Sequence, residues 1–159
     1  MSAAPRDARA RVRMLAALYR RTEYAVAAPD GTAILRVGAP PPRAIADWIG
    51  ARGSAVFLSA CNPYSQPLAD AENRVRDARL RERLRRDGAD FLDGEGSIPG
   101  SPWREPGVLI AGAPAYADAL AREFDQNASV GVAADGVRLR LYRADWRDAL
   151  GDADDVDWV

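Results

Sequence analysis

Apolar and polar positions alternate with two different periods in the N-terminal third of the chain. Residues 8–21 carry an apolar stripe at helical spacing with arginines around it, which predicts an amphipathic helix. Residues 23–28 and 32–37 are β-compatible runs separated by a Pro-Asp-Gly turn, so we expect a hairpin. A run of prolines ends the hairpin, and the pattern after it predicts a second helix that stops at Gly53.

The middle of the chain changes abruptly from apolar to polar. Residues 54–60 are typical of a buried strand, and the proline-punctuated turn Asn62–Pro67 follows at once. Because a residue before proline is disfavoured in the helical region, Asn62 is expected to stay extended and to end the strand. An arginine-rich helix is then predicted from about Leu68 to Asp87, with a narrow apolar face and a glycine stop.

The last part of the chain alternates short strands with one helix. Residues 93–106 are rich in glycine, proline and serine and are expected to form a loop, which would be long for a compact domain. Strand-like runs occupy 108–112, 128–133 and 137–142, and a helical pattern occupies 114–124. An Asp-Gly turn joins the last two runs, so a second hairpin is expected there.

This order of elements predicts a single α/β (α+β) domain at residues 8–144. Hairpins at both ends and β-α-β units between them imply a mixed sheet of about six or seven strands with helices packed on it. A chain of 159 residues is long enough to bury a substantial core in one domain. Residues 145–159 form an acidic C-terminal segment that we expect to be partly ordered.

Composition removes several classes of chemistry. All 22 basic residues are arginine, so there is no lysine for a Schiff base or a phosphate-binding P-loop. The absence of histidine excludes Ser-His and Cys-His relays and imidazole metal ligands. The single cysteine, Cys61, excludes an internal disulfide and a thiolate metal cluster. A net charge of −1 does not indicate a globally basic nucleic-acid binder.

The exclusive use of arginine is typical of proteins encoded by GC-rich bacterial genomes. No apolar run approaches the ~18 residues needed to span a bilayer, so no membrane association is expected. Arginines interrupt the apolar positions of the N-terminus, and no signal-peptide core follows them. We therefore predict a cytoplasmic bacterial protein.

Candidate ligand-binding residues begin in the turn after the buried strand. A strand that runs through a polar turn into a helix N-terminus is a common geometry for binding an anion or a polar ligand. The Asn62 amide and the Ser65 hydroxyl are expected to face such a ligand, although a simple helix cap explains the same residues. Asn73 and Arg76 share one face of the following helix, and Arg76 suits a bidentate contact with carboxylate or phosphate.

The glycine-rich loop supplies two further candidates. Trp103 is expected to act as a stacking platform or a cover, and Glu105 as a general base, an arginine partner or a metal ligand. With Asp93 and Glu95, Glu105 would give three carboxylates near one loop, enough for a divalent metal through oxygen atoms. We assign no metal and no cofactor from this pattern.

Gln126 and Asn127 lie at a helix-to-strand junction. They either cap the helix and form the turn or approach the same ligand as the preceding candidates. We therefore predict a cleft formed by the Asn62–Ser65 turn, the loop 94–105 and the junction 125–128.

Several short motifs, taken in order, resemble the bacterial domain-of-unknown-function family 3293. The matching segments are Tyr19–Tyr24, Leu35–Gly38, Ser59–Ser65, Glu72–Arg74, Gly94–Gly96, Trp103–Glu105 and Phe124–Ala128. The resemblance covers nearly the whole predicted domain, from about Leu15 to Tyr142. It implies that these segments belong to one architecture, and it supplies no activity.

The leading hypothesis is a protein that binds a small polar or anionic ligand, nucleotide-like or phosphorylated, in the predicted cleft. If a reaction takes place there, Glu105 is the expected base, and hydrolysis or group transfer fits the residue inventory. The sequence leaves open whether the protein is an enzyme. The alternative is a non-catalytic interaction or regulatory module whose arginine-rich helix binds an acidic protein partner or the chain's own aspartate-rich tail.

Overall fold

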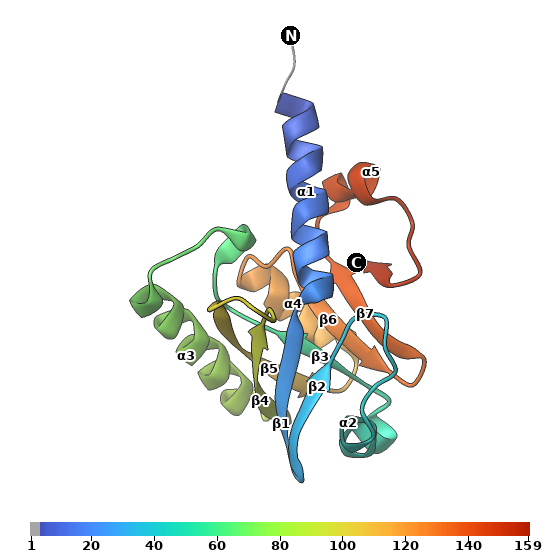
Figure 1. The fold of residues 1–159 in the computed structure, drawn as a ribbon. Helices are drawn as coiled ribbons and strands as arrows, with labels where there is room; N and C mark the ends of the chain where they lie inside the picture. The colour runs from blue at the N-terminus through green and yellow to red at the C-terminus, as the bar shows by residue number, and fades with distance from the viewer. Residues whose placement is uncertain (1–3) are drawn as a thin grey trace.

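One eight-stranded sheet organises the computed structural model, which describes residues 4–159 (Figure 1). The strand order is β2-β1-β4-β5-β3-β6-β7-β8. Neighbouring strands run antiparallel, except that β8 lies parallel to β7. The strands are β1 (Glu23–Ala28), β2 (Gly31–Leu35), β3 (Ser54–Leu58), β4 (Phe91–Ser97), β5 (Arg104–Ala111), β6 (Ala128–Ala133), β7 (Gly136–Leu141) and β8 (Val156–Trp158).

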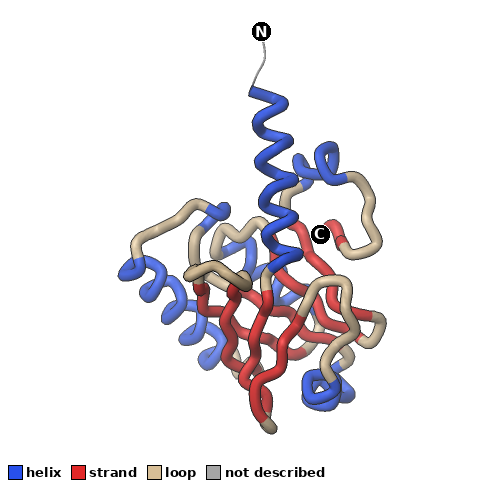
Figure 2. The backbone as a smooth tube through the Cα atoms, viewed as in Figure 1, coloured by secondary structure: helices blue, strands red, loops and turns tan. Residues whose placement is uncertain are grey.

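The helices cover both faces of this sheet, which twists and curls as Figure 2 shows. They are α1 (Ala4–Arg21), α2 (Arg43–Ile49), α3 (Asp70–Arg86), α4 (Pro114–Glu123) and α5 (Arg147–Leu150), with short 3-10 turns η1 (Gly50–Arg52), η2 (Pro63–Ser65) and η3 (Ala144–Trp146). The N-terminal half of α1 projects beyond the end of the sheet (Figure 1).

The central strand β3 is buried on both faces, which explains its continuous apolar sequence. On one face, Phe57 joins a core that includes α2 and against which apolar residues of α1 pack. On the other face, Val56 and Leu58 pack against Leu80 and Leu84 of α3 and against α4. Alternate residues of one strand therefore hold the two helical layers together.

The predicted α/β (α+β) class, the order of the elements and both terminal hairpins are confirmed. The strand count is eight, one more than the upper end of the prediction, because part of the acidic tail forms β8. Its three residues pair with β7 at the sheet edge, from Leu139↔Val156 to Leu141↔Trp158. Such a short edge strand has no periodicity that a sequence pattern can detect.

The loop predicted at residues 93–106 is wrong, because most of it belongs to the β4–β5 hairpin. The two strands pair without interruption from Phe91↔Ile110 to Ser97↔Arg104, and only residues 98–103 connect them. One of the glycines that suggested a loop serves a packing purpose: Gly94 faces Gly107 across the strand pair, and the ring of Phe57 lies against both. A Cβ on Gly94 or Gly107 would lie only 2.4 or 2.6 Å from that ring.

The topology gathers several chain segments at one end of the sheet. The end of β3, the end of β4, the start of β5 and the start of β6 meet there, because these strands are antiparallel neighbours. The C-terminal end of α1 leads directly into β1 at the same end. The η2 turn follows β3, so the predicted candidates Asn62 and Ser65 lie at this end of the sheet.

Candidate functional site

A cavity of about 250 Å³ lies at this end of the sheet. Its lining comes from α1, β1, β3, the turn around η2, the β4–β5 connection and the segment between α4 and β6. Six of the eight predicted site residues line it, namely Asn62, Ser65, Trp103, Glu105, Gln126 and Asn127. Asn73 and Arg76 are not part of the lining. The structure thus brings three distant sequence segments together, as the cleft hypothesis requires.

Asn62 is the centre of the polar network beside the cavity. Its side-chain amide donates to Glu105 Oε2 at 2.7 Å, while its Oδ1 accepts from Asn73 Nδ2 at 2.8 Å and from Leu68 N at 3.0 Å. The backbone N–H of Asn62 in turn donates to Asn73 Oδ1 at 2.9 Å. Asn73 therefore stands behind the turn and orients Asn62, which explains an asparagine inside a helix.

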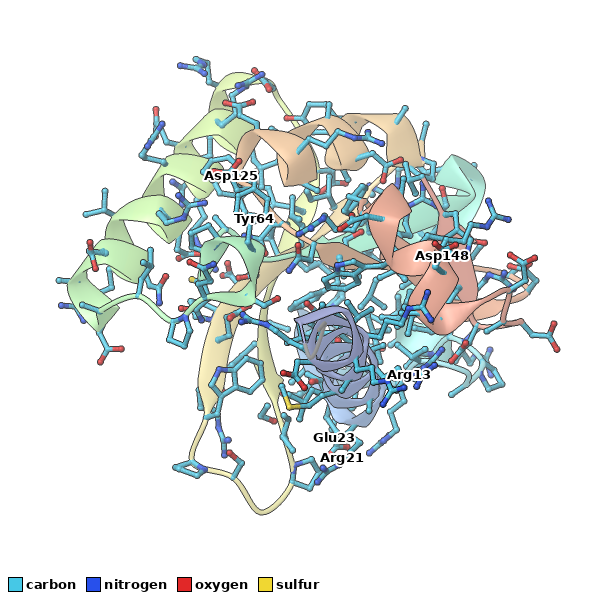
Figure 3. All side chains as sticks on the ribbon, turned by 90° about the horizontal axis from the view of Figure 1, so that it is seen from above. Arg13, Arg21, Glu23, Tyr64, Asp125 and Asp148 are labelled. Atoms are coloured by element: carbon cyan, nitrogen blue, oxygen red, sulfur yellow. The ribbon has the colours of Figure 1, made fainter. Side chains whose placement is uncertain are left out.

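The backbone of this turn is unusual. Asn62, Tyr64 and Ser65 all have positive φ angles, of 49°, 52° and 57°. The expectation of an extended Asn62 is therefore wrong, since its backbone is left-handed. Asparagine tolerates this conformation, but tyrosine and serine in it cost of order 1–3 kcal/mol each. The Tyr64 N–H donates to the carbonyl of Asp125 at 2.7 Å, and their side chains meet as Figure 3 shows. Contacts with distant segments thus hold the turn in a shape that its own residues disfavour.

Ser65 connects the turn to α1 and to β6. Its hydroxyl lies 2.5 Å from the Tyr19 hydroxyl and accepts from Asn127 Nδ2 at 3.0 Å. Asn127 Oδ1 accepts from Arg143 at 3.1 Å, and the Asn127 side chain is buried. Burial raises the pKa of Tyr19, so its phenol stays protonated and remains able to donate.

Glu105 is the one acidic side chain in the lining that the structure describes. Burial raises the pKa of its carboxyl above the ordinary value of 4.5, and hydrogen bonds from Asn62 and Ser59 oppose part of the rise. A carboxylate held in this way beside a cavity can accept a proton or a hydrogen bond from a ligand. Cys61 lines the same cavity, and burial raises the pKa of its thiol to about 11, so it is not an activated nucleophile.

We expect the Glu105→Gln variant to gain stability relative to the wild type as the pH rises. Because the folded-state pKa of Glu105 is raised, its favourable contribution is complete below 4.5 and is lost as the pH rises through the raised value. Glutamine does not titrate and its carbonyl still accepts from Asn62. Urea unfolding of both proteins at and below pH 4.5 and near neutrality measures the difference, and a difference independent of pH would contradict the assignment.

Arg76 and Gln126 hold the turn against the end of α4. Arg76 Nε donates to the carbonyl of Ala60 at 2.6 Å, and its Nη2 donates to the carbonyl of Phe124. Gln126 Nε2 donates to the carbonyls of Cys61 at 3.0 Å and of Phe124 at 3.1 Å. Nε and Nη2 of Arg76, which were expected to bind an anion, thus donate to backbone carbonyls. The Gln126 side chain lines the cavity, but its amide N–H groups donate to the backbone of the turn and of the end of α4.

Replacing Arg76 by alanine is expected to lower the free energy of unfolding by about 1–3 kcal/mol, because the carbonyl of Ala60 loses the Arg76 donor and that of Phe124 keeps only the Gln126 amide. Arg79→Ala is the matched control on the same helix, since Arg79 is exposed, and we expect it to change stability by less than about 0.5 kcal/mol. Chemical denaturation measures both. Equal effects of the two substitutions would contradict the structural role of Arg76.

Apolar and aromatic side chains form most of the remaining wall. The sequence did not single them out as site residues, since they lie in stripes that indicate core packing. They are Leu15, Leu18, Tyr19, Tyr24, Phe57, Ile98, Val130 and Leu139. Trp103 lines the cavity with 37% of its surface exposed and lies over Gly96, where an added Cβ would be 3.5 Å from the indole. No arginine lines the cavity within the described part of the chain.

The three carboxylates considered for a metal do not converge. Gly96 pairs with Glu105 and Glu95 pairs with Pro106, so Glu95 and Asp93 point to the face of the hairpin opposite Glu105. Asp93 instead pairs with Arg81 of α3. Among residues 4–159, no group of three or more acidic or cysteine side chains is arranged to hold a metal ion.

The acidic tail does not meet the arginine-rich helix α3 in the described structure. Its aspartates pair with arginines elsewhere, including Arg20 of α1 with Asp155 at 2.7 Å and Arg138 of β7 with Asp157 at 2.9 Å. The structure therefore does not show the predicted contact in which α3 binds the chain's own acidic tail. None of the helices formed by residues 4–159 has the length and apolarity required to cross a membrane.

Residues 58–129 match the family model described as "Protein of unknown function (DUF3293)", which confirms the resemblance for the motifs from Ser59–Ser65 to Phe124–Ala128. The motifs Tyr19–Tyr24 and Leu35–Gly38 lie outside the matched segment. The matched segment runs from the end of β3 to the start of β6 and contains all the predicted site residues. No curated protein and no solved structure matches the chain.

Proposed function

We propose that this chain, whose residues 58–129 carry the DUF3293 family domain, binds a small organic molecule in the cavity at the end of its sheet. One observation carries the proposal: polar residues from three distant segments converge on a cavity whose other walls are apolar. Pockets that bind small molecules combine apolar walls with a few placed polar groups in this way.

The cavity suggests how a ligand would lie. A polar group would point towards Glu105, Asn62 and Ser65, and an apolar body would rest against residues such as Phe57 and Leu18. Trp103 would cover the ligand, as the sequence pattern suggested. At ~30 Å³ per water, the volume of about 250 Å³ equals roughly eight water molecules, which favours a small ligand over a nucleotide.

The charge of the cavity lining favours a polar ligand over the anionic ligand that the sequence also suggested. The charged side chain of the described lining is a carboxylate. Arg76, the residue predicted to bind an anion, donates to backbone carbonyls instead. A phosphorylated ligand would place like charges together in a partly buried site, which is unfavourable. If the bound molecule is turned over, Glu105 is the residue we assign as its general base.

The alternative interaction module rests on a specific surface. Arg74, Arg79, Arg85 and Arg86 are exposed on the outer side of α3, whereas Arg81 and Arg83 form the ion pairs of this helix. An acidic protein partner would bind there rather than at the cavity, so the two functions predict different contact regions.

A fragment screen followed by amide-resolved NMR tests the proposal on the intact chain. We expect binding fragments to shift the amide signals of Asn62, Glu105 and Asn127, while signals from the outer side of α3 stay unchanged. A screen without cavity binders would overturn the ligand-binding proposal. Shifts confined to the exposed arginines of α3 on addition of acidic peptides would support the interaction module instead.

A further inference from the structure

The charge inside the cavity is of one sign. Glu105 is the charged side chain that lines it, and Arg143, which reaches the neighbouring network through Asn127, is paired with Asp145 at 2.8 Å. Asn62 and Ser59 donate to the Glu105 carboxyl but do not neutralise it. A carboxylate has two oxygens with about four acceptor positions, so positions remain for a donor on a ligand.

Aromatic rings surround the same space. Tyr24 and Phe57 pack together with ring centroids 5.2 Å apart and planes tilted by 58°. The Tyr24 hydroxyl donates to the carbonyl of Tyr19 at 2.9 Å, which fixes the ring that Tyr24 contributes to the wall. Tyr19 and Trp103 complete an aromatic lining that comes from α1, β1, β3 and the β4–β5 connection.

This combination has a specific chemical preference. The faces of aromatic rings carry negative potential and attract cations, and the attraction grows when water is excluded. A nearby carboxylate adds a counter-ion, and no cationic side chain of the described lining competes for it. An anionic ligand would meet repulsion from both, whereas a neutral ligand could accept or donate hydrogen bonds but would gain no charge attraction.

Building on the ligand-binding role proposed above, we infer that the cavity selects organic ammonium ions. The ligand would be a small amine with an apolar or aromatic body, its ammonium group bound by Glu105 and the rings of the wall. The volume of about 250 Å³ accommodates an arylalkylamine of modest size. Asn62 acts as the positioning residue, since it orients the carboxylate through its 2.7 Å hydrogen bond.

The protonation states around the cavity agree with this choice. Besides Glu105, the titratable groups that line it are Tyr19 of α1, Tyr24 of β1 and Cys61 after β3. Burial raises the pKa of all three, so they are neutral near pH 7 and Glu105 is the lining group that can carry a negative charge. Alkylamines ionise near the lysine value of about 10.4, so the ligand stays cationic at neutral pH.

Isothermal titration with three probes of similar shape tests the inference: phenethylamine, 2-phenylethanol and 3-phenylpropionate. We expect the amine to bind at least about tenfold more tightly than the alcohol, and the acid to bind most weakly. The amine's affinity should fall as the pH is lowered through the raised pKa of Glu105, while that of the alcohol stays constant. Equal binding of amine and alcohol would overturn the inference.

Two glutamate variants make the test specific. Glu105→Gln keeps the shape and an acceptor for Asn62, and we expect it to lose the tenfold preference for the amine while retaining the alcohol. Glu95→Gln removes an exposed carboxylate from the adjacent strand, where it faces Arg104 at 3.5 Å, and should leave both affinities unchanged. Unchanged amine binding by the Glu105→Gln protein would contradict the role of this carboxylate.

The two proposals fail in different ways. If the alcohol or the acid binds at the cavity as tightly as the amine, the choice of an ammonium ligand is wrong and ligand binding stands. The same holds if no probe binds but the fragment screen finds other cavity ligands. If neither the probes nor the screen yields a cavity ligand, both proposals are wrong.

Discussion

Replacing Asp118 by alanine is expected to lower the free energy of unfolding by about 3–5 kcal/mol. Asp118 lies on α4 with 5% of its surface exposed, and both its oxygens bind Arg140 of β7, at 2.9 and 2.6 Å. The Tyr142 hydroxyl also donates to it at 2.7 Å. Removal of Asp118 leaves the largely buried Arg140 guanidinium with only a weak pair to Asp157 at 3.9 Å, which is far more costly than loss of an exposed pair.

The control for this prediction is a similar pair on the surface. Arg143 also binds both oxygens of one aspartate, Asp145, but the Asp145 side chain is 63% exposed. Asp145→Ala should cost about 0–1 kcal/mol, since water screens the pair. Chemical denaturation near neutral pH measures both variants. Similar losses would show that the Asp118 pair is not buried in solution.

Gly94→Ala is expected to destabilise the protein by about 1–3 kcal/mol, the range for overpacking a core. A Cβ at this position would stand 2.4 Å from the Phe57 ring and 2.8 Å from the backbone oxygen of Ala25. Since Phe57 lines the cavity, we also expect the substitution to weaken any ligand bound there.

Gly96→Ala provides the matched control on the same strand. Its Cβ would meet Thr22 at 3.4 Å and Trp103 at 3.5 Å, which are close to ordinary contacts, so the expected loss is smaller. The double variant Gly94→Ala/Phe57→Leu should recover part of the stability lost by Gly94→Ala, because a smaller side chain makes room. Thermal unfolding compares the proteins, and equal destabilisation by the two alanines would refute the packing argument.

The site residues were found from the sequence to different extents. Six predicted site residues stood out in the sequence because a simple connection between a strand and a helix does not require such side chains. All six line one cavity: Asn62, Ser65, Trp103, Glu105, Gln126 and Asn127. Their functional roles stay predictions. Tyr19, Tyr24 and Phe57 were missed, because an aromatic residue in an apolar stripe looks the same whether it fills a core or walls a cavity.

Arg76 shows the opposite problem. Its charge and helical position suggested an anion ligand, but a sequence does not show whether a guanidinium meets a ligand or two distant carbonyls. The carbonyls of Ala60 and Phe124 are separated from Arg76 by 16 and 48 positions in the chain, so only the folded turn brings them within its reach.

The sequence by itself determined the α/β class, the order of the helices and hairpins, the excluded chemistries and the family resemblance of residues 58–129. These properties follow from local periodicity, turn residues and composition, which need no distant contact. Only the tertiary structure decided that most of the glycine-rich segment is a hairpin, because the strand glycine Gly94 is explained by the Phe57 ring of another strand. The sign of charge in the cavity was decided in the same way, since it depends on which side chains from distant segments face one space.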